Sequence, residues 1–171
     1  TTQQTPNRAS KDTLARLLAS ENITVQHQPV PTACFDVLNR TLILPIWKDM
    51  SDDVYDMLVM HEVGHALYTP AGEEALMDAI NSIDAKNPGA VKQYLNICED
   101  PRIEMLIKKK FPGGRRQFAI AYTDLWERGF FDCTESEIKT KGFGDRANLY
   151  FKVGFLMADG TIPFNDMEQD I

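Results

Sequence analysis

The amino-acid sequence predicts an α+β fold in which a small antiparallel sheet near the N-terminus packs on a mainly helical remainder. Two observations support this. The strand-like runs all precede Trp47, and the segments with helical periodicity all follow it. A chain of 171 residues is the size of one domain, and no repeat, low-complexity tract or linker divides it. We therefore expect residues 1–171 to form a single domain, with flexible ends at 1–9 and from about 160 to 171.

The N-terminal part predicts one short helix and three strands. Ser10 can cap a helix that carries leucines on one side. Alternating or β-branched runs predict strands over 23–27, 34–38 and 41–46. Asn39 and Arg40 lie between the last two runs and fit a tight hairpin turn, which favours antiparallel pairing.

The rest of the chain predicts a series of helices. Ser51 is a suitable N-cap, and two aspartates follow it in the first turn, where the helix dipole favours negative charge. Pro and Gly residues between the periodic segments mark the helix ends. The predicted helices cover 51–68, 73–85, 90–110, 115–128 and 145–158, and a short one follows the capping-box pattern at 134–137.

Composition excludes several classes of protein. The net charge of −7 argues against a nucleic-acid-binding domain. No apolar run approaches the roughly 20 residues that span a membrane, and the first residues lack the apolar core of a signal peptide. The three cysteines are too widely spaced for a disulfide framework or a cysteine zinc finger. We therefore expect a cytoplasmic protein that binds neither nucleic acid nor membrane.

The motif His61-Glu62-Val63-Gly64-His65 lies within the helix predicted over 51–68. Residues four apart lie on one helical face, so the imidazoles of His61 and His65 can converge on one zinc ion. Glu62 is about 100° further round the helix, from where its carboxylate can reach a metal-bound water as a general base. Gly64 is a poor helix former, and we expect it to allow the close approach of another element.

A catalytic zinc site needs a third protein ligand, and the acidic cluster Glu99-Asp100-Pro101-Arg102-Ile103-Glu104 is the best source. On a helical wheel Glu99 lies between apolar residues, where an unpaired carboxylate would be costly, so we take Glu99 as the third ligand. Asp100 and Glu104 lie on the flank and suit the orientation of a ligand histidine. They remain alternatives to Glu99, because a helix restarting at Pro101 would rotate the wheel.

The two motifs resemble those of the gluzincin branch of the zincin metallopeptidases. The pattern of HExxH followed by Glu-Asp-x-Arg-x-Glu is similar to peptidase-like domains of phage and bacterial proteins that often precede a von Willebrand A domain. The similarity covers about residues 35–110. It implies a zincin-like domain in which His61, His65 and Glu99 bind Zn²⁺ and Glu62 is the catalytic base. It also implies that the edge of the small sheet receives the substrate peptide.

These observations predict a zinc-dependent peptidase that acts on a protein or peptide. The transition state also needs a donor to the developing oxyanion, and the sequence offers four candidates without selecting one, namely Tyr68, Arg102, Tyr122 and Tyr150. The alternative is a zinc-binding interaction or assembly module with little or no proteolytic activity, which would bind a protein partner. The basic run at 108–116 is a candidate anion-binding patch, although cations are also typical of a helix C-terminus.

Overall fold

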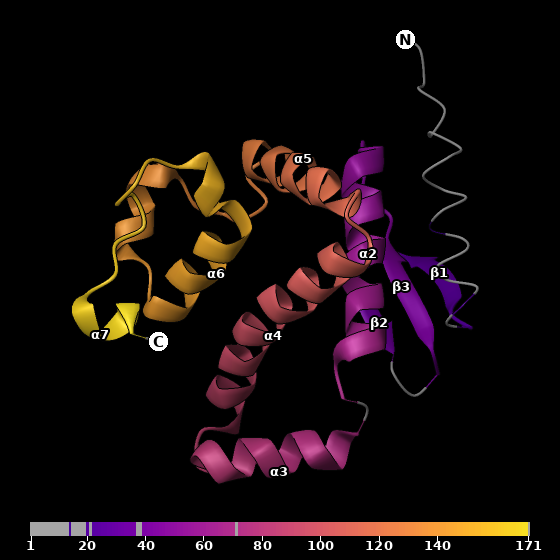
Figure 1. Ribbon diagram of the computed structural model, residues 1–171, viewed down its shortest axis with the longest axis horizontal. Helices are drawn as coiled ribbons and strands as arrows, with labels where there is room; N and C mark the ends of the chain where they lie inside the picture. The colour runs from indigo at the N-terminus through magenta and orange to yellow at the C-terminus, as the bar shows by residue number, and fades with distance from the viewer. Residues whose placement is uncertain (1–13, 15–19, 21, 37–38, 71, 171) are drawn as a thin grey trace.

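The computed structural model describes residues 14, 20, 22–36, 39–70 and 72–170. The predicted flexible segment 1–9 and most of the helix predicted after Ser10 lie outside these residues. The fold is α+β, with a three-stranded sheet at the N-terminal side of a helical body (Figure 1). Its elements, in order, are β1 (Thr24–Gln28), β2 (Cys34–Asp36), β3 (Thr41–Pro45), α2 (Asp52–Tyr68), α3 (Glu73–Asp84), α4 (Pro88–Lys110), α5 (Gly114–Glu127), η1 (Glu135–Thr140), α6 (Phe143–Val153), η2 (Gly154–Leu156) and α7 (Asp166–Gln169).

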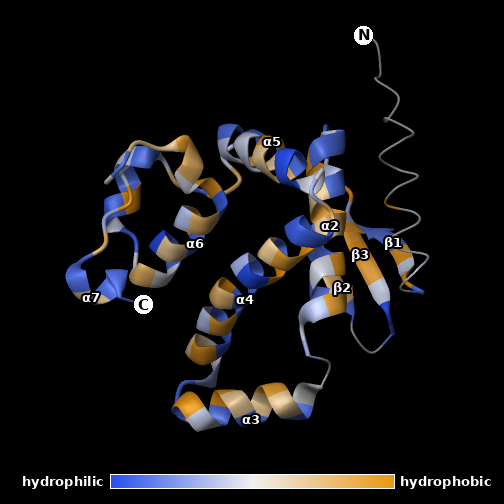
Figure 2. Ribbon diagram, in the orientation of Figure 1, coloured by the Kyte–Doolittle hydropathy of each residue, from blue (hydrophilic) through white to orange (hydrophobic). Residues whose placement is uncertain are grey.

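The sheet has the order β1-β3-β2 and is mixed. β2 pairs with β3 antiparallel, as the predicted hairpin requires, but β1 pairs with β3 in parallel, so the prediction of an antiparallel sheet is wrong for β1. β3 lies at the centre of the sheet and is its most apolar strand (Figure 2). Its residues Leu42 and Leu44 are fully buried. A strand flanked on both sides can satisfy all its backbone groups while burying such side chains.

Helix α2 forms where the sequence predicts it. The Ser51 hydroxyl accepts a hydrogen bond from the Val54 amide at the N-terminus and donates one to Asp124 of α5 at 2.6 Å. This cap therefore satisfies a free amide and also joins α2 to α5. Helix α2 packs on both strands of the hairpin and on α4 and α5, and it is the central helix of the fold.

Helices α2 and α4 approach each other closely at Gly64. A Cβ at this position would lie 2.9 Å from Cδ1 of Ile103, which is fully buried in α4. The expectation that Gly64 permits the close approach of another element is therefore confirmed. The same contact brings the HExxH motif against the acidic cluster of α4.

The C-terminal segment packs on α6. Ile162 is buried, the ring of Phe164 contacts Phe143 and Tyr150, and Arg146 of α6 forms an ion pair with Glu168 of α7 at 2.5 Å. The structure thus places residues 160–170, where the sequence suggests a flexible end, against the helical body. No described helix combines the length and apolar composition needed to cross a membrane.

Candidate metal centre

The two histidines of the HExxH motif lie on the face of α2 that meets α4. The ring centroids of His61 and His65 are 4.9 Å apart, and neither side chain is more than a quarter exposed. The i, i+4 spacing therefore brings the imidazoles together in a partly buried position, as the sequence predicts.

Asp100 of α4 completes a group of three potential metal ligands. Its Oδ1 lies 3.7 Å from Nε2 of His61 and 3.3 Å from Nε2 of His65. Atoms that share a tetrahedral zinc at bond lengths of about 2.0–2.2 Å lie about 3.3 Å apart. Among the described residues, only His61, His65 and Asp100 form a cluster with ligand atoms within 4.8 Å of one another.

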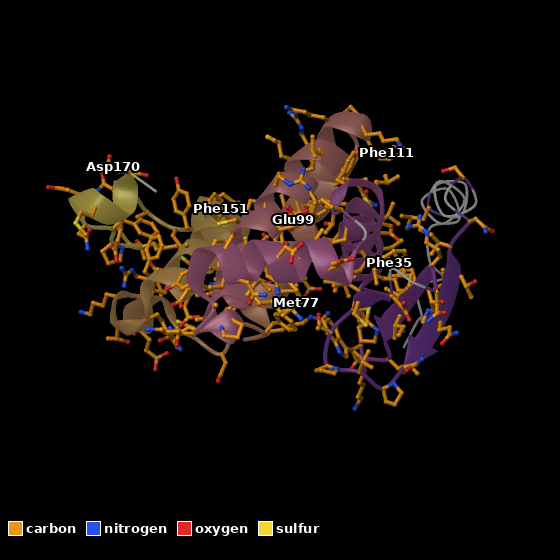
Figure 3. All side chains as sticks on the ribbon, turned by 90° about the horizontal axis from the view of Figure 1, so that it is seen from below. Phe35, Met77, Glu99, Phe111, Phe151 and Asp170 are labelled. Atoms are coloured by element: carbon orange, nitrogen blue, oxygen red, sulfur yellow. The ribbon has the colours of Figure 1, made fainter. Side chains whose placement is uncertain are left out.

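Glu99, the predicted third ligand, points elsewhere and is not part of this group; Figure 3 labels its position on α4. Its carboxylate accepts hydrogen bonds of 2.6 Å from the Thr69 hydroxyl and from the guanidinium of Arg102. The structure therefore favours Asp100, the alternative ligand, over Glu99. Glu99 acts on the site through Thr69, whose hydroxyl oxygen lies 2.9 Å from Nδ1 of His65.

The difference arises from the orientation of α4. The predicted wheel centres the buried face near Glu99 because Leu95 and Leu106 flank it, but both leucines are only partly buried. The most buried residues of this part of α4 are instead Ile103, Glu104 and Ile107. Helix α4 also continues through Pro101 rather than restarting there, so Asp100 and Glu104 lie one turn apart on the same face.

Glu104 holds the second ring nitrogen of His61. Its Oε1 lies 3.1 Å from Nδ1 of His61 and also accepts a hydrogen bond from the Tyr122 hydroxyl, and its Oε2 is 2.8 Å from Nζ of Lys108. Burial disfavours the carboxylate, but these partners, His61 first, lower the pKa of Glu104 to about 2. The predicted flank position of Glu104 thus corresponds to a role in orienting a ligand histidine.

The hydrogen bonds at Nδ1 define the tautomers of both histidines. The Glu104 carboxylate can only accept, and the Thr69 hydroxyl already donates to Glu99, so each Nδ1 carries the donated proton. In the neutral rings both Nε2 atoms then face Asp100 Oδ1 with a lone pair, whereas a protonated His65 donates a hydrogen bond from Nε2 to Asp100. Three acceptor atoms facing one another repel unless a proton or a metal cation lies among them.

Lys152 of α6 supports Asp100 from the other side. Its Nζ donates to Asp100 Oδ2 at 2.8 Å, and both side chains are mostly buried. Burial raises the pKa of the Asp100 carboxyl, but the hydrogen bond from His65 and the charge of Lys152 hold this pKa well below its usual range. Asp100 is therefore ionised at neutral pH, as a metal ligand must be. The sequence does not predict a role at this site for Lys152 or Thr69, and it marks Lys108 only as part of the basic run 108–116.

Glu62 is buried beside the ligand group. Its side chain is 7% exposed, and within the described part of the chain no protein donor is hydrogen-bonded to its carboxylate. Burial raises the pKa of Glu62 above its ordinary value, although the two histidines act in the opposite direction. A carboxylate with a raised pKa and unused acceptor oxygens suits a general base that takes a proton from water.

The four candidate oxyanion donors differ in the hydrogen bonds that they already form. Tyr122 is committed to Glu104, and Arg102 to Glu99 and the Tyr68 backbone carbonyl. Tyr150 is about half exposed and its ring packs on Phe164. Within the described residues the hydroxyls of Tyr68 and Tyr150 form no hydrogen bond, so these two are less committed than Tyr122 and Arg102.

The donor set fits zinc. It combines two imidazoles whose Nδ1 atoms are engaged by Glu104 and Thr69 with one ionised carboxylate, and three protein ligands would leave a fourth position for water or substrate. Comparisons with protein-family models, curated proteins and solved structures find no match for this chain. The functional interpretation therefore depends on the geometry of the site itself.

Proposed function

We propose that this protein is a zinc-dependent peptidase, with His61, His65 and Asp100 as the metal ligands. The observation that carries the proposal is the convergence of two imidazole Nε2 atoms on one carboxylate oxygen at 3.3 and 3.7 Å. With both rings neutral this arrangement leaves three acceptors facing one another, and only a proton on one Nε2 or a metal cation relieves it. The adjacent Glu62, buried and without a protein partner, distinguishes a hydrolytic centre from a structural zinc site.

The chain's own residues then divide the work of hydrolysis. A bound zinc ion would polarise the scissile carbonyl and lower the pKa of a coordinated water toward about 7. Glu62 accepts the proton of the attacking water and passes it to the leaving amine. Glu104 and Thr69 hold His61 and His65 in the orientation that exposes Nε2, and Lys152 restrains Asp100.

Strand β2 is the element on which we place the substrate. Among the described residues it pairs with β3 alone, so its outer edge is a position at which another strand can be added. Burial and then the negative charge of Glu62 raise the pKa of the Cys34 thiol. The first residue of β2 therefore lies within range of the charge of the proposed base. A peptide added along this edge would carry its backbone past Glu62.

Metal analysis and cleavage assays on matched variants test the proposal. We expect about one zinc per chain in purified protein and cleavage of a peptide library that stops when zinc is chelated. Glu62→Gln should retain zinc but lose cleavage, whereas Glu127→Gln, an exposed charge change on α5, should retain both. Undiminished cleavage by Glu62→Gln would refute the mechanism.

A different outcome would support the second function. Stoichiometric zinc with no cleavage by the wild-type protein would favour the binding module, in which the same three ligands stabilise a surface for a protein partner. Either function is consistent with the cytoplasm, where we propose that the protein acts and where its cysteines, all unpaired in the described structure, would stay reduced.

A further inference from the structure

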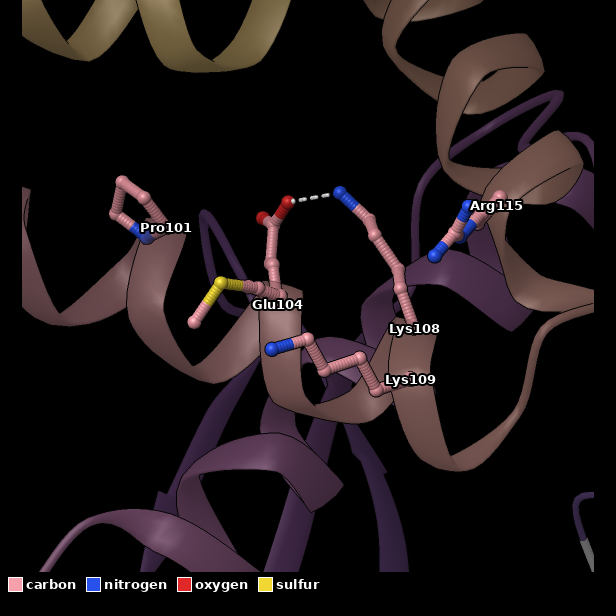
Figure 4. Close-up of a pocket in the computed structure, with 6 residues that line it drawn as sticks. Pro101, Glu104, Lys108, Lys109 and Arg115 are labelled. Carbon is pink, nitrogen blue, oxygen red and sulfur yellow. Dashed lines mark hydrogen bonds and ion pairs between the residues drawn. The ribbon is translucent and has the colours of Figure 1, made fainter.

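A cavity of about 300 Å³ lies beside the candidate metal centre, along α4 and the start of α5 (Figure 4). It is lined by Pro101, Glu104, Met105, Lys108, Lys109 and Arg115. Three of these six residues are cations and one is an acid. The local excess of positive charge contrasts with the net charge of −7 of the whole chain.

The charges at this cavity are only partly compensated. Glu104 is paired with Lys108 and so contributes little net negative charge. Lys109 and Arg115 are exposed, and neither has an acidic partner among the described residues. Position at a helix C-terminus accounts for lysines on α4, but Arg115 lies in the first turn of α5, where the dipole disfavours a cation.

One residue of the cavity wall contacts a candidate metal ligand. Glu104 forms part of the cavity wall, and its Oε1 lies 3.1 Å from Nδ1 of His61. Since Nε2 is on the opposite side of the imidazole, a zinc ion would lie no more than about 7 Å from that oxygen. This distance corresponds to roughly two residues of extended peptide.

We propose that this cavity is a subsite for an acidic side chain of the peptide substrate, a proposal that rests on the peptidase function above. Lys109 and Arg115 supply the two uncompensated charges, which suit a carboxylate or two neighbouring carboxylates. Pro101 and Met105 supply apolar surface for the methylene groups of a glutamate. The small number of free cations and the acidic character of the chain disfavour an extended polyanion such as nucleic acid.

Peptide binding to the Glu62→Gln protein tests the subsite without turnover. A short fluorescent peptide with two glutamates is compared, by anisotropy at low ionic strength, with the same peptide carrying glutamines. We expect the acidic peptide to bind more tightly and Lys109→Glu/Arg115→Glu to weaken it by about tenfold or more, because two exposed ion pairs of about 0.7 kcal/mol each are lost. The control Lys86→Glu/Lys92→Glu changes two exposed cations elsewhere and should alter binding by less than about twofold.

The remaining outcomes are equally informative. Equal binding of both peptides, or equal weakening by the control pair, would overturn the proposal. The acidic peptide is also titrated with inorganic phosphate and, separately, with acetate at the same concentrations. Displacement by phosphate but not by acetate would overturn the proposal in favour of a phosphate site. The neutral variant Lys109→Gln/Arg115→Gln should bind the acidic peptide with intermediate affinity. It keeps the proposal testable if the charge-reversed variant does not fold. If the peptides discriminate but wild-type protein cleaves nothing, the peptidase function fails while the acidic-peptide site stands.

Discussion

Replacing Asp100 by Asn discriminates most sharply among the possible third ligands. The change keeps the size of the side chain but removes the charge that faces His61 and His65 at 3.7 and 3.3 Å. Residues that only support a zinc ligand typically contribute 10–100-fold to metal affinity. Loss of a charged ligand itself should therefore exceed about 100-fold, or about 2.7 kcal/mol.

Glu99→Gln is the matched comparison, since it also replaces a carboxylate by an amide on the same helix. Its effect passes through the Thr69 hydroxyl, and the amide oxygen can still accept that hydrogen bond. We expect zinc affinity to fall by less than about tenfold.

Competition with a chromophoric chelator measures the affinities, and thermal unfolding provides an independent readout. At free zinc 100 times above the wild-type Kd, binding stabilises the protein by about 2.7 kcal/mol, which corresponds to a rise in Tm of about 5–10 °C for a domain of this size. Asp100→Asn should show less than about a fifth of that rise. A larger loss for Glu99→Gln than for Asp100→Asn would refute the assignment, and no loss for either would refute the site.

Three further predictions concern the stability of the protein. The folded pKa of Glu104 is about 2 against 4.5 for the free group, so its carboxylate contributes on the order of 3 kcal/mol above pH 4.5. In urea unfolding at a series of pH values, the advantage of wild type over Glu104→Gln should shrink as the pH falls from about 4.5 towards 2, and a constant gap would contradict this. Lys152→Met leaves Asp100 partly buried without its cation and should lower the free energy of unfolding by about 2 kcal/mol in the same assay. Saturating zinc should narrow this difference because the ion replaces the lost charge. The control Lys152→Arg should lower the free energy of unfolding by less. Gly64→Ala should lower the free energy of unfolding by about 1–2 kcal/mol, because the new Cβ would lie 2.9 Å from Ile103. Adding Ile103→Val to Gly64→Ala should recover part of that loss. Purely additive losses of the two substitutions would contradict the packing argument.

The sequence contained enough information to predict the central helix and the convergence of His61 and His65. Ser51, the HExxH spacing and Gly64 are local signals, and each has the structural role that its chemistry suggests. Local signals also predicted the β2–β3 hairpin. The parallel pairing of β1 depends on which strand is buried on both sides, a property of the assembled sheet.

The position of Asp100 beside the two histidines was harder to predict, because the charged residues of α4 disturb the apolar pattern from which its buried face was placed. The face of α4 that packs on α2 includes the ionised Asp100 and Glu104. A buried face predicted from the positions of the leucines alone is therefore centred on Glu99, to one side of the observed face. Their i, i+4 spacing, the same as that of His61 and His65, was a signal that could have indicated two acids on one face. The contribution of Lys152 depends on how α6 folds back on α4, which no local pattern encodes.

The tautomers described above also determine how the site must fill. In the metal-free protein, burial lowers the pKa of His65, but its hydrogen bond to Asp100 and the surrounding carboxylates raise that pKa overall. If the proposed zinc site exists, a proton and the metal ion compete for the space between Nε2 of His65 and Oδ1 of Asp100. Loading should liberate acid, and the calorimetric heat should vary with the ionisation enthalpy of the buffer, while an acidified compartment would empty the centre without any change in the chain.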